Sequence, residues 1–534
     1  MKKKSKLHSN SLIKITFQNK TIAMYQKAPT LLLKTIFAIL LFLISSVGNS
    51  LSKKDPSGAP KTFISQYENI LGTSFEMKVT AAYRQQGAAA EKTALDEIKR
   101  LSKILSAYDA SSEFSNWMKT KDIPVKISTE LFEVLQLMDE WRIKTNGALD
   151  PSAEIITRLW KSAALQQTLP SSIELQAAVS KVHQRHWLLD QSAKTAVHLS
   201  DAPLMLNSFV KSYIIQHAVD EVLKNKEIKS VVINIGGDIV VAGDTNEPIG
   251  IVDPKAAAVN DELLDNIKIN NKSIATSGNY RRGELINGQW YSHIVDPRTG
   301  MPVNQIISAT VIANHATDAG ALATAFNVLT TEASIQLAQQ IEGAEYLIIT
   351  KDGERIESNG WRNYETATVK KKTVSPNTIT MDHRISDFEL LINLELSQIQ
   401  GGARRPFVAI WVEDNNKNSI RTVSIWYNKP RWLHELRAWS NANNNKFSPE
   451  SGNMASIASA TRSAGKYTIK WDGKDDKGVD VKNGTYTIHI EVAREHGTYQ
   501  LMSQEIKIGE LPFKIDLGAN AEVAGASLEY KKKD

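Results

Sequence analysis

Residues 231–243 read VVINIGGDIVVAG, and this stretch is the densest cluster of structural signals in the chain. Four of its first five residues are apolar and β-branched, with Asn234 as the exception, and such a run is typical of a buried strand. Gly236 and Gly237 end the run, because glycine accepts the positive φ of a tight turn and lets a ligand approach the backbone. Asp238 follows directly. We interpret Gly236, Gly237 and Asp238 as candidate ligand contacts, although a Gly-Gly pair after a strand is more often only a turn.

Helix and strand patterns are interspersed on both sides of this strand. Apolar side chains recur at helical spacing in residues 91–107, and residues 129–144 and 208–224 have a similar pattern. Residues 267–270 (IKIN) and 310–313 (TVIA) are further strand candidates. Because the helices and strands do not alternate strictly, the sequence favours an α+β fold over a doubly wound parallel sheet.

The character of the chain changes after an expected linker at 369–384. Short segments rich in Ile, Val, Tyr and Trp follow, separated by turn clusters such as DNNKN at 414–418. They predict a small β-sandwich domain over residues 385–510, with a tail at 511–534. The strand candidates are 385–397, 406–413, 420–427, 466–471, 484–494 and 499–508.

The N-terminal segment predicts export from the cytoplasm. Residues 35–47 (TIFAILLFLISSV) are apolar but short of the roughly 20 residues that span a bilayer. Lysines precede this run and small residues follow it, so we interpret residues 1–50 as a signal peptide, with Met24 as the better start, and 51–62 as a linker. We expect a periplasmic protein, which an uncleaved signal would hold at the inner membrane.

Composition excludes several classes of function. The net charge is +6, but lysines at the two ends supply much of it, and no basic run with interleaved aromatic residues indicates nucleic-acid binding. The chain has no cysteine, which excludes disulfides, thiolate metal sites, a cysteine nucleophile and a lipidated cysteine anchor.

A second polar motif, IATSGNYRR, occupies residues 274–282. Thr276 and Ser277 offer hydroxyl groups, Gly278 offers a backbone N–H, and two arginines supply positive charge. Such a loop suits a phosphate or pyrophosphate group. Taken alone, it would be read as a polar hairpin turn.

Two more motifs follow. HIVDPRTG at 293–300 places His293, which titrates near neutrality, close to Asp296, a carboxylate able to orient it. DAGALATA at 318–325 begins a predicted helix that carries Asp318 and Thr324. Carboxylate, hydroxyl and carbonyl oxygens together make the kind of site that Mg²⁺ takes.

In this order and spacing, NIGGD, TSGNYRR, HIVDPRTG and the DAGALATA helix resemble the ApbE family of FAD:protein FMN transferases. LGT at 71–73, LSAYDASSEFSNW at 105–117 and GALDP at 147–151 agree with the same family. The resemblance covers about 63–368. The C-terminal region resembles a domain of unknown function that often follows ApbE domains.

The resemblance implies a T-fold-type flavin transferase domain and a Mg²⁺-dependent reaction. FAD is cleaved, and FMN is joined through a phosphoester to a Thr or Ser of a periplasmic acceptor, such as a flavoprotein of a membrane or periplasmic redox system. His293 would assist proton transfer from the acceptor hydroxyl. The metal would contact the Ser208 carbonyl and the Thr324 hydroxyl, with Asp318 as a further candidate. By position, the residues in contact with FAD would be Leu71, Tyr108, Ala148, Leu149, Asp150, Lys211 and Ser308.

The chain departs from the family pattern at two positions. Gly320 and Met205 stand where the family has aspartates that contact the metal and FAD. Asp318 is two residues away, about 200° around a helix, so it replaces the first only if it reaches the ion from a loop. Three readings therefore stay open: an active transferase, a flavin-binding homologue without catalysis, and a β-domain that docks either one to a membrane redox partner.

Overall fold

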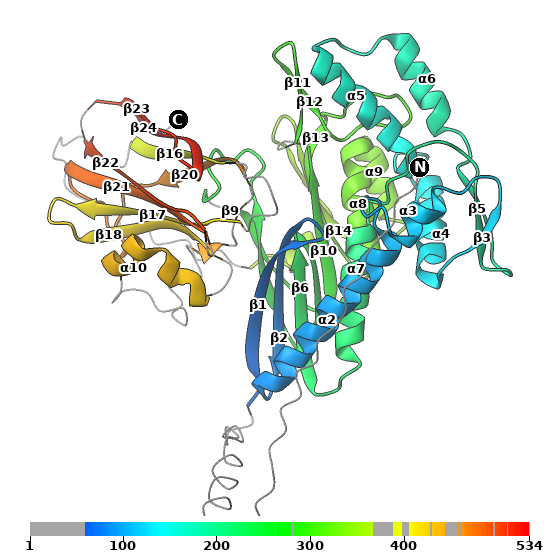
Figure 1. Cartoon of the computed structure of the whole chain (residues 1–534), viewed down its shortest axis with the longest axis horizontal. Helices are drawn as coiled ribbons and strands as arrows, with labels where there is room; N and C mark the ends of the chain where they lie inside the picture. The colour runs from blue at the N-terminus through cyan, green and yellow to red at the C-terminus, as the bar shows by residue number, and fades with distance from the viewer. Residues whose placement is uncertain are drawn as a thin grey trace, which may run out of the picture. The chain divides into compact units, whose positions relative to one another are not determined.

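An eight-stranded antiparallel sheet lies at the centre of the residues that carry the motifs (Figure 1). Its strands in spatial order are β1 (Lys61–Ile70), β2 (Thr73–Ala81), β6 (Ile228–Ile235), β7 (Asp238–Gly243), β10 (Lys272–Gly278), β13 (Ile306–Ala313), β14 (Glu345–Thr350) and β15 (Arg355–Glu357). Gly236 and Gly237 form the turn from β6 to β7, with φ of 59° and 97°. Both values lie in the left-handed region, which explains the glycine pair.

The structure is a computed structural model that describes residues 59–261, 263–279, 282–366, 388–397, 405–427, 430–443, 458–459, 462, 464–494, 497–509 and 511–532. The predicted signal peptide at 1–50 and the linker at 369–384 lie outside the described residues. Within the described ranges, no helix combines the length and the apolar character that a membrane crossing requires.

Three helices pack against one face of the sheet: α2 (Arg84–Leu105), α7 (Val210–Leu223) and α8 (Ala316–Val328). Figure 1 shows α2 and α7 running side by side, and the two helices are in contact. Much of the sequence of α8 is alanine and glycine, and ten of its thirteen residues are buried. Side chains this small let a helix lie close to its neighbours, so α8 can approach the first turn of α7.

The opposite face of the sheet carries a second apolar cluster. It includes Val232 and Val241 of the sheet, Ile267 of a separate hairpin, and the fully buried Trp361. The hairpin consists of β8 (Glu247–Val252) and β9 (Leu263–Ile269). With helices on one face and a hairpin on the other, the predicted α+β class is confirmed.

The remaining elements before residue 366 are two smaller sheets and several short helices. A three-stranded sheet joins β3 (Pro124–Lys126), β5 (Thr195–His198) and β4 (Trp187–Asp190), and a hairpin joins β11 (Gly283–Ile286) and β12 (Gln289–Ser292). The helices are α3 (Glu113–Trp117), α4 (Thr129–Lys144), η1 (Pro151–Ala153), α5 (Glu154–Gln166), α6 (Ser172–Val182), α9 (Thr331–Ala338) and η2 (Trp361–Asn363).

The C-terminal region consists of two sheets that share an apolar core, and all their strand pairs are antiparallel except the pair β18–β19. One contains β20 (Gly465–Trp471), β16 (Phe388–Leu396), β24 (Val523–Lys532) and β23 (Phe513–Leu517). The other contains β19 (Ala458–Ser459), β18 (Ser419–Trp426), β17 (Phe407–Asp414), β21 (Gly484–Ala493) and β22 (Tyr499–Ile508), with η4 (Pro430–Glu435) and α10 (Arg437–Asn443) between β18 and β19 in the chain. All six strand candidates are present as strands.

The expected tail at 511–534 is not a tail in this structure. Its described part forms β23 and β24, and β24 pairs with β16 from Phe388 to Leu396. Leu528 and Tyr530 are buried in the shared core. The terminal lysines made this segment look like a solvated end, yet alternate residues of β24 point into the core, as a half-buried strand requires.

Candidate functional site

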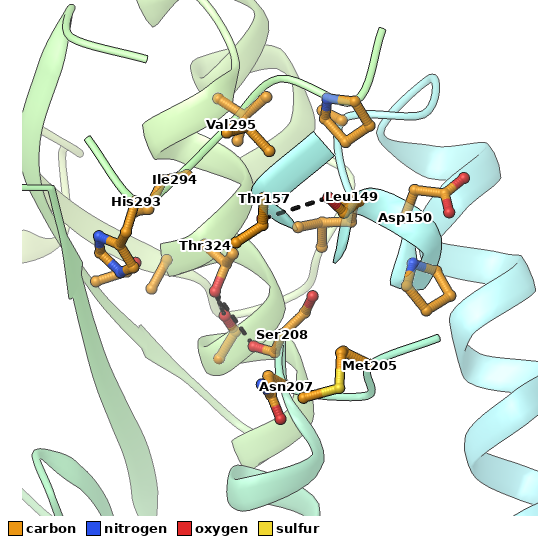
Figure 2. A pocket seen from close by; sticks show the side chains of 18 of the residues that line it. Leu149, Asp150, Thr157, Met205, Asn207, Ser208, His293, Ile294, Val295 and Thr324 are labelled. Atoms are coloured by element: carbon orange, nitrogen blue, oxygen red, sulfur yellow. Dashed lines mark hydrogen bonds between the residues drawn. The ribbon is translucent and has the colours of Figure 1, made fainter. Parts of the chain in front are cut away.

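A pocket of about 400 Å³ lies where the first turn of α7, the middle of α8 and the strands β7 and β10 meet the segment 148–157 (Figure 2). Ten of the residues predicted from the sequence line it: Ala148, Leu149, Asp150, Ser208, Lys211, Asp238, Thr276, Ser277, His293 and Thr324. Segments far apart in the sequence thus supply a single cavity with hydroxyl groups, carboxylates, an ammonium group and an imidazole.

Other predicted residues lie beside the pocket rather than in its lining. Tyr108 is 77% exposed, and its hydroxyl accepts a 2.8 Å hydrogen bond from the side chain of Asn207, which does line the pocket. Gly278 and Ser308 are paired neighbours on β10 and β13, next to the lining residue Ser277. Leu71, in the turn from β1 to β2, and the turn residues Gly236 and Gly237 are not among the lining residues.

Lys211, Ser212 and Asp238 form a polar triad between α7 and β7. The Lys211 ammonium lies 3.3 Å from Oδ1 of Asp238, and the Ser212 hydroxyl donates to Oδ2 at 2.8 Å. The Asp238 side chain is only 14% exposed. Burial raises the pKa of this carboxyl group, while the neighbouring Lys211 opposes the rise.

Oxygen atoms gather where α8 faces the start of α7. The Thr324 hydroxyl lies 3.2 Å from the Ser208 carbonyl oxygen and 3.0 Å from the Gly320 carbonyl oxygen (Figure 2). Within the described residues, no three His, Cys, Asp or Glu side chains are arranged to hold a metal. These neutral hydroxyl and carbonyl oxygens share the pocket with the carboxylate of Asp238, and such oxygens suit a hard cation such as Mg²⁺, which takes oxygen ligands and keeps several waters.

Ser212 fills the space next to Gly320. A Cβ atom built on Gly320 would lie 2.5 Å from the Ser212 hydroxyl oxygen and 3.3 Å from its Cβ. A side chain at position 320 would therefore require the Ser212 hydroxyl to move. Asp318 is in the first turn of α8, half-buried near His315 and Lys144, and is not among the lining residues of the pocket.

His293 is held by a backbone carbonyl group. Its Nδ1 lies 2.9 Å from the carbonyl oxygen of Arg282. A carbonyl oxygen only accepts, so Nδ1 carries the proton and Nε2 of the neutral ring keeps its lone pair. Desolvation by the surrounding protein lowers the pKa of His293. The hydrogen bond to the Arg282 carbonyl opposes this shift, while the positive charges of Arg282 and Lys161 add to it. The imidazole is therefore neutral at pH 7 and able to accept a proton at Nε2.

Asp296 does not have the role expected from its spacing. Its carboxylate binds the guanidinium of Arg298 through two hydrogen bonds of 2.8 and 2.9 Å. It also accepts the backbone N–H of Arg298 at 2.9 Å, which closes an Asx turn. The turn directs the carboxylate along its own loop, so the Arg282 carbonyl rather than Asp296 orients His293.

One wall of the pocket is formed by η1 and α5, and GALDP is the only motif that the sequence shows in this region. Asp150 is buried and paired with Arg142 at 2.7 Å, and Glu154 is paired with Arg158 at 3.0 Å. Thr157 lines the pocket one turn after Glu154. Their spacing of three on a helix that directly follows GALDP is the signal that could have identified both. Arg282, which belongs to the predicted phosphate-binding loop, also lines the pocket. The remaining lining residues, for which the sequence predicts no contact, are Pro151, Ala153, Met205, Asn207, Ala275, Ile294, Val295, Pro297, Gly320, Ala323 and Val328.

Two family models match different parts of the chain. A family model described as "ApbE family" matches residues 71–348, and one described as "Predicted periplasmic protein (DUF2271)" matches residues 389–524. The FAD:protein FMN transferase of Vibrio cholerae is 26% identical over 310 residues, which cover 56% of this chain and 90% of that protein. The protein of the same name from Haemophilus influenzae is 28% identical over 333 residues, covering 58% of this chain and 91% of that protein.

A solved structure supports the fold. The ApbE protein of Thermotoga maritima aligns with a TM-score of 0.51 and 24% identity, over 57% of this chain and all of that protein. The shared part is the sheet-and-helix region that carries the pocket, and the C-terminal sheets are additional to it.

Proposed function

The chain belongs to the ApbE family, and we propose that it is a Mg²⁺-dependent FAD:protein FMN transferase that modifies a protein in the periplasm. The names of its relatives support the reaction. The second family match, to a predicted periplasmic protein, supports the compartment, as does the N-terminal sequence. The acceptor would be a Thr or Ser hydroxyl of a flavoprotein in a membrane or periplasmic redox system.

The observation that carries the proposal is the convergence of separate motifs on one pocket. His293 supplies a neutral base, Thr276 and Ser277 supply hydroxyl donors, and Lys211 supplies a positive charge. A pocket of about 400 Å³ is within the usual range for a small-molecule site. Donors and a cation beside a base are what transfer of a phosphate-linked group to a hydroxyl requires.

The reaction is a displacement at phosphorus. The acceptor hydroxyl oxygen attacks the phosphorus atom of the FMN half of FAD, and its proton passes to Nε2 of His293. The bond from this phosphorus to the bridging oxygen breaks, and AMP leaves with the electron pair. Lys211 and the hydroxyl groups of Thr276 and Ser277 are placed to stabilise the negative charge of the phosphate oxygens.

The Ser208 carbonyl and the Thr324 hydroxyl are the oxygens that would hold Mg²⁺, since they lie together on the pocket wall. When bound, the ion neutralises charge on the pyrophosphate. The backbone of α8 positions the Thr324 oxygen, because this hydroxyl is also within 3.0 Å of the Gly320 carbonyl one turn earlier.

A second candidate function is a flavin-binding homologue that does not transfer FMN. The observation in its favour is Gly320, which offers no side chain beside Thr324, together with Met205, whose thioether lines the pocket. In that case the pocket would hold FAD for binding or docking only.

Incubation of the purified chain with FAD, with Mg²⁺ or with EDTA, distinguishes the two functions. With water in place of the acceptor hydroxyl, we expect FAD to be hydrolysed to FMN and AMP in a reaction that requires the metal and is lost in His293→Ala and Thr324→Ala. His183→Ala is the matched control, because His183 is an exposed histidine at the end of α6 outside the pocket. Tight FAD binding without AMP release, with or without metal, would support the flavin-binding homologue instead.

A further inference from the structure

Three carboxylates line the described part of the pocket, and they differ in how firmly they are engaged. Asp150 is buried and bound by Arg142 at 2.7 Å, and one of its oxygens also accepts from the backbone and side chain of Ser152. Glu154 lies on α5 and is bound by Arg158. Of these three ion pairs, the one between Asp238 and Lys211 is the longest, at 3.3 Å. It is the carboxylate that lies on the α7–α8 side of the pocket, through its contact with Ser212.

Ser212 connects this carboxylate to α8. Its hydroxyl oxygen lies 2.5 Å from the position of a Cβ on Gly320, and the same hydroxyl donates to Oδ2 of Asp238 at 2.8 Å. The Ser212 hydroxyl, which belongs to α7, thus occupies the space beside α8 that a side chain at position 320 would take. The contact holds an oxygen of Asp238 next to that space, one helical turn before Thr324.

Asp238 keeps lone pairs that its partners do not use. An ionised carboxylate offers about four acceptor sites. Lys211 takes one on Oδ1 and Ser212 takes one on Oδ2. The neighbouring oxygens of Ser208 and Thr324 lie within 3.2 Å of each other. A hard divalent cation prefers such a set of carboxylate, hydroxyl and carbonyl oxygens, completed by water and phosphate.

We propose that Asp238, held in place by Ser212, is the carboxylate ligand of a divalent cation that also contacts the Ser208 carbonyl and the Thr324 hydroxyl. The metal site is thereby assembled from β7, α7 and α8, and positions 212 and 320 act as a pair. In its present position the Ser212 hydroxyl occupies the space that a side chain at 320 would enter. The inference deepens the proposed function, because it assigns the metal contact of the same pocket.

Binding of Mn²⁺ alone to the full chain, without FAD or an acceptor, tests the assignment through the electron paramagnetic resonance signal of the free ion. Asp238→Asn keeps the shape and removes the charge, and we expect Kd to rise by about 10- to 100-fold or more. Asp201→Asn is the matched control, because Asp201 is an exposed acid paired with Lys121 away from the pocket. We expect it to leave Kd unchanged.

The pairing of positions 212 and 320 gives a second, independent test. In Ser212→Gly/Gly320→Asp, a carboxylate on α8 replaces that of Asp238, so Mn²⁺ binding is retained. We then expect Asp238→Asn, added to this double variant, to raise the Kd for Mn²⁺ by less than about threefold. This is well below the loss of about 10- to 100-fold that follows from changing a residue that only contacts a metal ligand. The rescue also shows that Asp238→Asn acts on the metal site and not on folding.

Several results would overturn the assignment. They are the absence of Mn²⁺ binding by the wild-type chain, an unchanged Kd in Asp238→Asn, loss of binding in Asp318→Asn instead, or equal loss in the Asp201→Asn control. Because the titration contains neither FAD nor an acceptor, a chain that binds Mn²⁺ through Asp238 but releases no AMP would refute the transferase function alone. A chain that releases AMP without needing Asp238 would refute the metal assignment alone.

Discussion

Gly320→Ala tests how tightly Ser212 fills the space beside α8. In an open helix, replacing glycine by alanine stabilises by about 1 kcal/mol. Here the new Cβ would lie 2.5 Å from the Ser212 hydroxyl oxygen and 3.4 Å from the Phe209 Cα. Overpacking of a closed site costs about 1–3 kcal/mol. The clash outweighs the helix gain, so we expect net destabilisation of up to about 2 kcal/mol.

Removal of Ser212 should reverse the sign. In a Ser212→Gly background the closest atom is gone, so Gly320→Ala should stabilise the protein by up to about 1 kcal/mol. The two positions then show a coupling free energy of about 1–3 kcal/mol, as residues in contact do. Thermal unfolding of the four proteins measures this cycle, at about 2–4 °C per kcal/mol for a domain of this size. If Gly320→Ala stabilises the wild type and the Ser212→Gly variant equally, the two side-chain positions do not compete.

Three further outcomes follow from individual contacts. The rate of AMP release should rise with pH through an apparent pKa below about 6.5, because His293 must be neutral to accept a proton and its pKa is lowered; His293→Gln should abolish this limb of the pH–rate profile. Arg142→Ala should destabilise by about 3–5 kcal/mol in thermal unfolding, since it leaves the buried Asp150 without its partner, whereas the exposed Arg158→Ala costs at most about 1 kcal/mol. Glu491→Gln should lower the unfolding temperature of the β-domain by the equivalent of about 1–3 kcal/mol. The two buried carboxylate oxygens of Glu491 accept the N–H groups of Ala438 and Trp439 at 2.9 and 2.8 Å, and the amide keeps one acceptor oxygen while its NH₂ group cannot accept the second N–H.

The sequence predicted those parts of the fold and the site in which the signal is local. The turn after β6 needs two residues at positive φ, and a Gly-Gly pair announces this directly. The helix stripe at 129–144 coincides with α4, because apolar residues at helical spacing must face one core. His293, Thr276 and Thr324 line the same pocket. They could be predicted because each lies in a motif whose residue types suggest a polar site.

What the sequence did not predict depends on partners that are distant in the chain or on local turn geometry. Asp296 is near His293 in sequence, but the Asx turn with Arg298 fixes its direction. The lysines of β24 suggest a solvated tail, while its pairing with β16 joins segments about 130 residues apart in the chain and leaves no local signal. Ser212 belongs to no recognisable sequence motif. Its importance becomes visible only in its short distance to Gly320 on another helix.

The two departures from the family pattern have a common electrostatic consequence. Met205 and Gly320 each stand where the resemblance places an acidic side chain, so the pocket has fewer negative charges than that pattern implies. Of the carboxylates that line it, Asp150 and Glu154 are neutralised by arginines, and Asp238 faces Lys211. Arg282 adds a positive charge to the lining. A pyrophosphate group is doubly negative, so this balance of charge favours binding of FAD even before a cation is present. In the proposed reaction, a cation held near Asp238 would therefore contribute less to holding the substrate than to stabilising charge as the phosphorus–oxygen bond breaks.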